Sequence, residues 1–337
     1  MTKKIVKPRW VTYRDMEGPR HLGRRDPGGA FIYEYSPPKP WGVWSQILGV
    51  VAACEGRHDT VVMYDGTGVT FGAFQWTFTS GRLQRLLEYF KSVPIVDFER
   101  DVNTTLFDWV CVHPDGCQVF EEFGFKILGG EFIESLLDSR GNMTERKLLP
   151  QRKADKRDIV DICMGKYSQH PKRSALQLCS LFAKLGQILE VQLAMVEYAK
   201  IEFKRSLDYR RPPLKEIGGT IRCLLPDEVW GTPIPAIFFN LFQNSPGEGF
   251  KFFKSAMSIA EKKGIVGLDS NGYSDVVDTD VLLDIIWSKL CLSRYADWGF
   301  GSKQYIASGG KNPPRVKNIR PALVKYYDVR LPYIGEL

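Results

Sequence analysis

The sequence lacks several features that would assign a protein to a class at once. Nowhere in its 337 residues do about eighteen uncharged apolar residues follow one another, so we expect no membrane span. The N-terminus is basic but has no apolar signal-peptide core, so we expect synthesis in the cytoplasm without an ordinary export signal. The basic residues are dispersed and no zinc-finger or RRM signature occurs, which predicts no nucleic-acid partner.

Cysteine is too sparse and too scattered for a disulfide framework. The seven cysteines are odd in number, which favours reduced and mostly buried thiols. One tight group, Cys111, His113 and Cys117, offers three side chains of the metal-ligand type. It lacks the close cysteine pair and the nearby fourth ligand of a zinc site, so we expect no metal ion and no cofactor.

Charge and hydrophobic content predict a folded domain preceded by a basic N-terminal segment. Hydrophobic residues make up 44% of the chain, enough for one large domain or a two-lobed one. The 46 Lys and Arg exceed the 39 Asp and Glu by seven, which favours anionic partners. Residues 1–45 hold nine basic and four acidic side chains. We interpret residues 1–39 as a basic extended arm, either docking to an acidic partner or simply solvated, and residues 40–337 as the folded domain.

A helix is predicted near residues 40–55. Trp44, Leu48 and Val51 recur at helical spacing, and Gly56 supplies a stop. Glu55 therefore lies at the end of an apolar helix face. Burial there should raise the pKa of the Glu55 carboxyl and keep it protonated near neutral pH.

Residues 60–78 change to the pattern of a β-hairpin around the turn DGTG. Gly66 and Gly68 permit positive φ in the turn, and Gly72, without a Cβ, permits another backbone or a sugar ring to approach. Asp65 is presented on this turn, where we expect it to be ionised. The hydroxyl of Thr70 could orient a water that Asp65 deprotonates, and Asp59 is an alternative base.

The residues that follow the turn offer saccharide contacts. Gln75 supplies an amide for sugar hydroxyls, and Trp76 supplies a flat apolar ring, although Trp76 could equally be a core residue. We expect Thr67, Gln75 and Trp76 to be the substrate-binding residues.

The rest of the chain is predicted to be mostly helical. One long central helix is expected near 175–203, with three more near 233–243, 249–263 and 279–292. The aromatic residues of this half should form core: Phe238, Phe239, Phe242, Phe250, Phe252, Phe253 and Trp287. The fold class is therefore α+β, mainly α-helical, with a small β-hairpin element.

The domain is expected to have two lobes. Lobe one covers about residues 40–137, and a helical lobe covers residues 175–337. The heavily charged residues 138–174 between them are interpreted as an exposed excursion.

A glutamate at a helix end followed by DGTGVTFG resembles the lysozyme-like superfamily, most closely the D-G-x-G-x-T pattern of the family-46 chitosanases. The FGAFQW that follows is similar to a strand of goose-type lysozymes and lytic transglycosylases. The resemblance implies a two-lobed lysozyme-like fold with a saccharide cleft between the lobes. It also implies that Glu55 is the general acid, Asp65 the base and Thr70 the residue that positions the water.

The basic chain suits an anionic polymer better than cationic chitosan, which favours a bacteriophage peptidoglycan hydrolase that cuts β-1,4 bonds of the cell wall. It would act as an endolysin after release or as part of a virion, with the arm contacting virion proteins. An inverting reaction requires the Glu55 and Asp65 carboxyls roughly 6.5–9.5 Å apart. A transglycosylase-like reaction of Glu55 alone, a chitosanase, and a non-catalytic virion or wall-binding protein remain alternatives.

Overall fold

The computed structural model describes most of the chain and forms an α+β fold that is mainly helical, as predicted. Two compact units divide the chain: Met1–Ala30 with Gly56–Tyr198, and Phe31–Glu55 with Ala199–Leu337. The described residues are 8–13, 16–21, 42–97, 102–112, 125–128, 131–137, 143–149, 152–166, 168–210, 219–244, 246–292 and 314–332.

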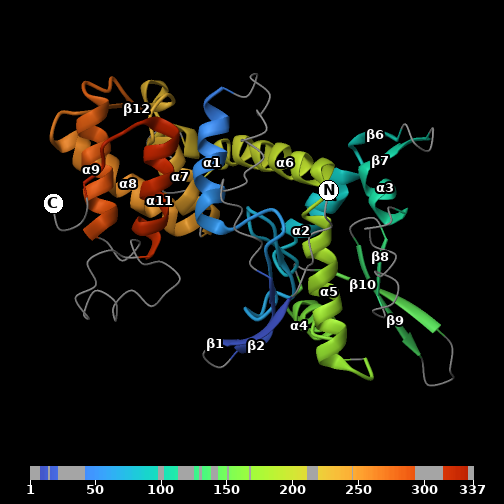
Figure 1. The fold of residues 1–337 in the computed structure, drawn as a ribbon. Coiled ribbons are helices and arrows are strands. Elements are labelled where there is room, and N and C mark those ends of the chain that lie inside the picture. Colours follow the sequence, from blue (N-terminus) through green and yellow to red (C-terminus); the bar gives the residue numbers. More distant parts are fainter. Residues whose placement is uncertain are drawn as a thin grey trace. The chain divides into compact units, whose positions relative to one another are not determined.

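A five-stranded antiparallel sheet organises the first unit (Figure 1). Its strands lie in chain order: β1 (Arg9–Tyr13), β2 (Met16–His21), β3 (Val61–Val62), β4 (Thr70–Phe71) and β5 (Trp76–Thr77). The predicted hairpin is confirmed, because Val61 pairs with Phe71 and Val62 with Thr70. The extended-arm interpretation of residues 1–39 is wrong for residues 9–13 and 16–21, because β1 and β2 pair with each other and β2 pairs with β3.

Smaller elements complete the first unit. They are α2 (Arg82–Phe90), β6 (Pro94–Asp97), β7 (Val102–Thr105), α3 (Leu106–Val112), β8 (Phe125–Leu128), β9 (Glu131–Leu137), β10 (Met143–Leu148), α4 (Lys153–Cys163) and α5 (Pro171–Leu185). The predicted excursion at 138–174 instead contains β10 and α4. Ile159 and Cys163 of α4 are buried, and Asp155 accepts a hydrogen bond from the backbone N–H of Leu149.

The predicted long helix over 175–203 is two helices. α5 ends at Leu185 and α6 (Leu189–Leu207) begins after a bend of 83°. Sequence periodicity continues across the break, so only Gly186 marks it. A Cβ on Gly186 would lie 2.2 Å from the carbonyl oxygen of His58, so glycine is required where α5 ends.

Aromatic side chains hold α5 against one face of the sheet. Phe182 of α5 contacts Phe71 and Phe78, with ring centroids 5.2 and 5.7 Å apart, and all three are fully buried. Cross-strand pairing places Phe71 beside Val61 and Trp76 on this face. The adjacent row, which contains Thr70, therefore points to the opposite face.

The second unit is helical around an aromatic core. It contains α1 (Val43–Glu55), 3-10 turns η5 (Ile221–Leu224) and η6 (Asp227–Val229), α7 (Ile234–Asn244), α8 (Pro246–Lys262), β11 (Gly267–Asp269), β12 (Gly272–Ser274), α9 (Thr279–Leu292) and α11 (Pro314–Tyr327). The end of the predicted helix at Glu55 and the three predicted C-terminal helices are confirmed. All seven aromatic residues predicted to form core are buried.

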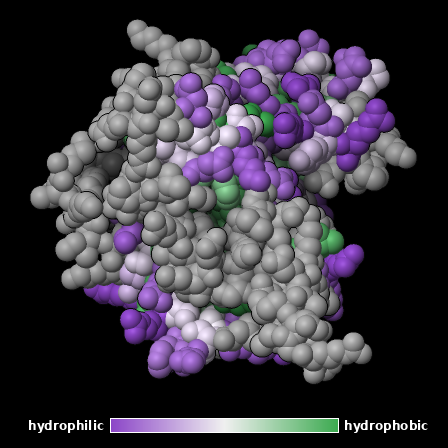
Figure 2. Space-filling view, turned by 90° about the vertical axis from the view of Figure 1, so that its right-hand side faces the viewer, coloured by the Kyte–Doolittle hydropathy of each residue, from purple (hydrophilic) through white to green (hydrophobic). Residues whose placement is uncertain are grey.

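The described surface is largely hydrophilic on the face drawn in Figure 2, where hydrophobic residues appear as small separate patches. In the described part of the chain, no single helix is long and apolar enough to cross a membrane. Only α5 and α6 taken together pass that test of length and composition, as a bent pair.

Candidate functional site

Asp65 lies at the centre of a hydroxyl cluster on the glycine-rich turn. Its Oδ1 accepts hydrogen bonds from the backbone N–H and the Oγ1 of Thr67, at 3.2 and 2.5 Å. Its Oδ2 accepts a hydrogen bond from Thr70 Oγ1 at 3.1 Å, and the two threonine oxygens lie 2.7 Å apart. Gly66 and Gly68 have φ of 72° and 80°, as predicted, so the turn can close around the carboxylate.

The strand order fixes the side of the sheet on which this cluster lies. Thr70 of β4 lies opposite Val62 of β3 and Thr77 of β5, so these side chains share a face. Thr70 itself is only 2% exposed, whereas Asp65 and Thr67 are half-buried. Two of the predicted site residues, Asp65 and Thr70, are therefore in direct contact, and Thr67 joins them.

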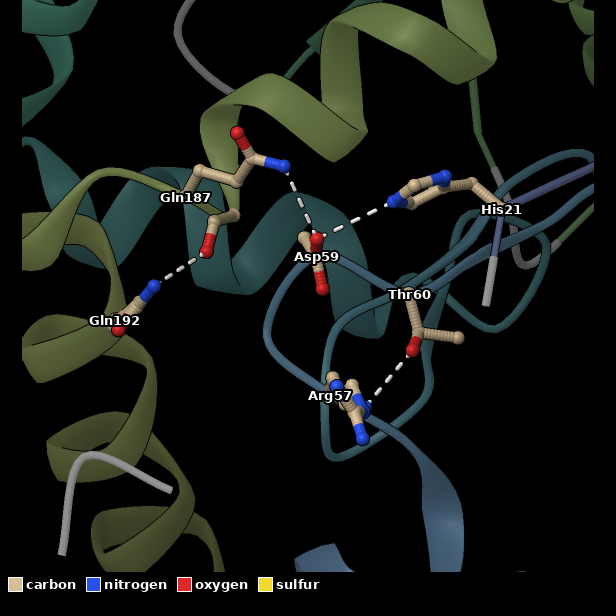
Figure 3. A network of polar contacts seen from close by, with 7 residues as sticks. His21, Arg57, Asp59, Thr60, Gln187 and Gln192 are labelled. Atoms are coloured by element: carbon tan, nitrogen blue, oxygen red, sulfur yellow. Dashed lines mark hydrogen bonds and ion pairs between the residues drawn. The ribbon is translucent and has the colours of Figure 1, made fainter. Parts of the chain in front are cut away.

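The alternative base, Asp59, belongs to a second polar cluster (Figure 3). Asp59 Oδ2 lies 3.2 Å from His21 Nε2 and accepts a hydrogen bond of 3.2 Å from Gln187 Nε2. The side chains of His21 and Asp59 are 13% and 12% exposed. The Asp59 carboxylate thus connects three segments: β2, the loop before β3 and the α5–α6 break. Asp59 therefore stabilises the fold and is also a candidate base.

Burial changes the chemistry of the residue next to Asp59. Desolvation lowers the pKa of His58 from its ordinary value of 6.5 to about 4, and the nearby Asp59 carboxylate opposes this shift. His58 is therefore neutral at neutral pH. The backbone of His58 and Asp59 packs directly against Gly186, whose carbonyl accepts a hydrogen bond from Gln192 Nε2 at 2.8 Å.

The residues after the turn differ in their surroundings. Trp76 is fully buried and contacts Phe74 and Tyr198, so it is a core residue here and offers no open ring face to a sugar. Gln75 is half-buried with a φ of 53°. The approach at Gly72 is made by a side chain, Met195 of α6, and not by the backbone or sugar ring that was predicted: a Cβ there would lie 2.1 Å from Met195 Cε.

Glu55 is the last residue of α1, but its side chain lies outside the described residues. By chain division Glu55 belongs to the second unit, whereas Asp65 belongs to the first. The predicted separation of the two carboxyls, and the cleft that would contain them, stay predictions.

Metal ligands do not gather in the described part of the chain, where no group of three or more His, Cys, Asp and Glu residues could hold an ion. The side chain of Cys111 and all of His113 and Cys117 lie outside that part. Four cysteine side chains are described, those of Cys163, Cys179, Cys223 and Cys291, and all four are free and buried, as predicted.

Sequence reasoning missed His21 and Gln187 as partners of Asp59. His21 was assigned to an extended arm, and Gln187 to the interior of a long helix. They lie 38 and 128 residues from Asp59 in the chain, so no local pattern connects them.

Comparison with known proteins finds no relative of this chain. No protein-family model, no curated protein and no solved structure matches the chain. The functional argument therefore rests on the residues themselves.

Proposed function

We propose that the protein is a glycoside hydrolase that cleaves β-1,4 bonds of peptidoglycan by an inverting mechanism. The contact between Thr70 Oγ1 and Asp65 Oδ2 carries this proposal. It joins the hydroxyl of a β4 residue to a carboxylate on the turn before β4, and both residues follow the helix that ends in Glu55, in the chain order of the lysozyme-like pattern.

The hydrogen bonds of the hydroxyl cluster support Asp65 as the base. An ionised carboxylate only accepts hydrogen bonds, and Asp65 accepts from the backbone N–H and the hydroxyl of Thr67 and from the hydroxyl of Thr70. These donors hold the carboxylate in one orientation, which a general base requires.

In this mechanism Glu55 protonates the glycosidic oxygen while Asp65 removes a proton from the attacking water. Water attacks on the face opposite the leaving group, and the anomeric configuration is inverted. Thr70 keeps the Asp65 carboxylate oriented. No metal or cofactor takes part in these steps.

The setting we propose is the bacterial cell wall. The net charge of +7 favours an anionic polymer over cationic chitosan. The protein would reach the wall as a released bacteriophage endolysin or within a virion, with its N-terminal segment contacting virion proteins. A chitosanase and a non-catalytic wall-binding protein are the competing proposals.

Product analysis tests the proposal. We expect the purified protein to release new reducing ends from peptidoglycan as α-anomers, seen by NMR immediately after cleavage, and to leave chitosan intact. Faster cleavage of chitosan would favour the chitosanase. Products with 1,6-anhydro ends would show a transglycosylase-like reaction instead of an inverting hydrolysis. The absence of products from both polymers would favour the non-catalytic wall-binding protein.

A further inference from the structure

Two arginines share the sheet face that carries Thr70. Arg9 of β1 lies directly opposite Arg20 of β2, Arg20 lies opposite Val62, and Val62 lies opposite Thr70. Directly opposed residues point to the same face. Neighbouring strands are about 4.8 Å apart, so two strand steps separate the Cα atoms of Arg20 and Thr70 by about 10 Å.

Arg20 is also held close to the Asp65 turn by an aromatic ring. Its guanidinium carbon lies 5.7 Å from the ring centre of Tyr64, the residue that precedes Asp65. This geometry is a cation–π contact, which orients the guanidinium plane. Arg20 Nε is shielded from solvent and has no hydrogen-bond partner among the described residues.

Neither arginine forms an ion pair within the described part of the chain. The ion pairs found there involve neither Arg9 nor Arg20. Glu17, the acidic residue of strand β2, lies on the other face, where it accepts a hydrogen bond from Trp10 Nε1. Like charges directly opposite on neighbouring strands repel each other, so this arrangement favours an anion supplied from outside.

We propose that Arg9 and Arg20 bind a carboxylate group of the polysaccharide whose backbone lies over Asp65. The guanidinium fork can hold both oxygens of a carboxylate, which gives orientation as well as attraction. This inference rests on the proposed function and sharpens its substrate class. The preferred glycan carries carboxylates on its side groups, as peptidoglycan does on its lactyl and peptide substituents, and is neither neutral nor cationic.

Binding is measured first, with catalysis removed. The Glu55→Gln protein is mixed with sedimented peptidoglycan freed of phosphate-bearing polymers, and its affinity is compared after Arg20→Gln, Arg20→Lys or Arg9→Gln is added. The control is Arg85→Gln, which removes the same charge from an exposed position on α2. We expect Arg20→Gln to weaken binding about tenfold, as for the loss of one charge-assisted hydrogen bond, Arg20→Lys less, and the control hardly at all.

Chemical amidation of the peptidoglycan carboxylates provides the second arm. On amidated peptidoglycan and on neutral chitin oligosaccharides, the Arg20→Gln and control proteins should bind alike. A tenfold difference that persists on amidated polymer would overturn the proposal, as would equal binding of both variants to untreated peptidoglycan. A difference that appears only when the phosphate-bearing polymers are left on the wall would reassign the site to phosphate and overturn the carboxylate assignment.

Hydrolysis by the Arg20 variants separates this inference from the proposed function. With Glu55 intact, Arg20→Gln should raise KM on peptidoglycan and change kcat little. If no variant hydrolyses the polymer while the carboxylate-dependent binding remains, the proposed hydrolase fails and the arginine site stands. Thermal unfolding of each variant shows whether it is still folded. If Arg20→Gln does not fold, the same binding comparison is made with Arg9→Gln, because Arg9 is exposed.

Discussion

At the scale of single residues, Asp65 and Asp59 are two carboxylates with different surroundings. Asp65 is bonded by the hydroxyls of Thr67 and Thr70, which lie within five residues of it. Asp59 is bonded by side chains from distant segments, His21 and Gln187. The Asp65 cluster involves only its own turn and β4, so it connects no distant segments. The Asp59 cluster, in contrast, connects segments that lie far apart in the chain. We therefore propose Asp65 as the base and a mainly structural role for Asp59.

Thr70 can be tested by removing only its hydroxyl. Thr70→Val keeps the shape but deletes the hydrogen bond to Asp65 Oδ2, so we expect peptidoglycan hydrolysis to fall about 10²-fold through misplacement of the base. Thr70→Ser keeps a hydroxyl and should retain most activity. The stability of both variants is measured by urea unfolding alongside their rates of hydrolysis. If both variants lost activity in proportion to their loss of stability, the positioning role of Thr70 would be contradicted.

His58 gives the protein an acid-sensitive core. Its pKa is 6.5 when unfolded and about 4 when folded, so the unfolded state binds the proton first as pH falls. Stability should therefore decrease from pH 6.5 towards pH 4, by up to about 3 kcal/mol from this residue. The comparison is with His58→Gln, which leaves the neighbouring side chains of His21 and Asp59 unchanged and in which the pH dependence of the unfolding midpoint should be flatter. The exposed residue His170, changed to Gln, is the control; equal slopes in all three proteins would contradict the assignment.

At the scale of elements, the α5–α6 break positions Gln187 beside Asp59. Gly186 has a φ of −67°, which alanine also adopts, so only space requires glycine there. Its missing Cβ accommodates the His58 carbonyl and the Asp59 Cα. The α5–α6 break and the loop before β3 therefore pack directly against each other at Gly186.

Gly186→Ala should destabilise the protein by about 1–3 kcal/mol in urea unfolding, as is usual for overpacking. Gly247, the second residue of α8, has open space around its would-be Cβ, so Gly247→Ala should instead change stability by less than about 0.5 kcal/mol. Equal effects of the two changes would show that the contact at Gly186 is unimportant.

Local patterns predicted the elements whose signals are themselves local. The hairpin across the DGTG turn follows from glycine and alternation, and the end of α1 follows from its apolar spacing and Gly56. The β1–β2 hairpin was missed although its strands are adjacent in the sequence, because Arg14 and Asp15 between them lack the glycine or asparagine that marks such a turn. The strand that pairs with β2 on its other side, β3, lies some forty residues away. The α5–α6 break was missed because apolar spacing continues through Leu185 and Ile188, and the tertiary contact at Gly186 decides the fold there.

At the scale of the whole molecule, the fold is α+β with two compact units. The carboxylate proposed as the base lies in the first unit, and the helix that ends in Glu55 lies in the second. The proposed mechanism needs one acid from each unit. Its central claim is therefore that Glu55 acts on the same glycosidic bond as Asp65.

The most direct test measures reducing ends released from purified peptidoglycan by the wild type, Glu55→Gln and Glu88→Gln. Glu88 is an exposed acid of α2 and serves as the matched control. General acid catalysis contributes about 10²–10⁴ in rate, so we predict a fall of that size in Glu55→Gln and none in Glu88→Gln. Wild-type activity that survives in Glu55→Gln, or that is absent in all three proteins, would contradict the hydrolase mechanism.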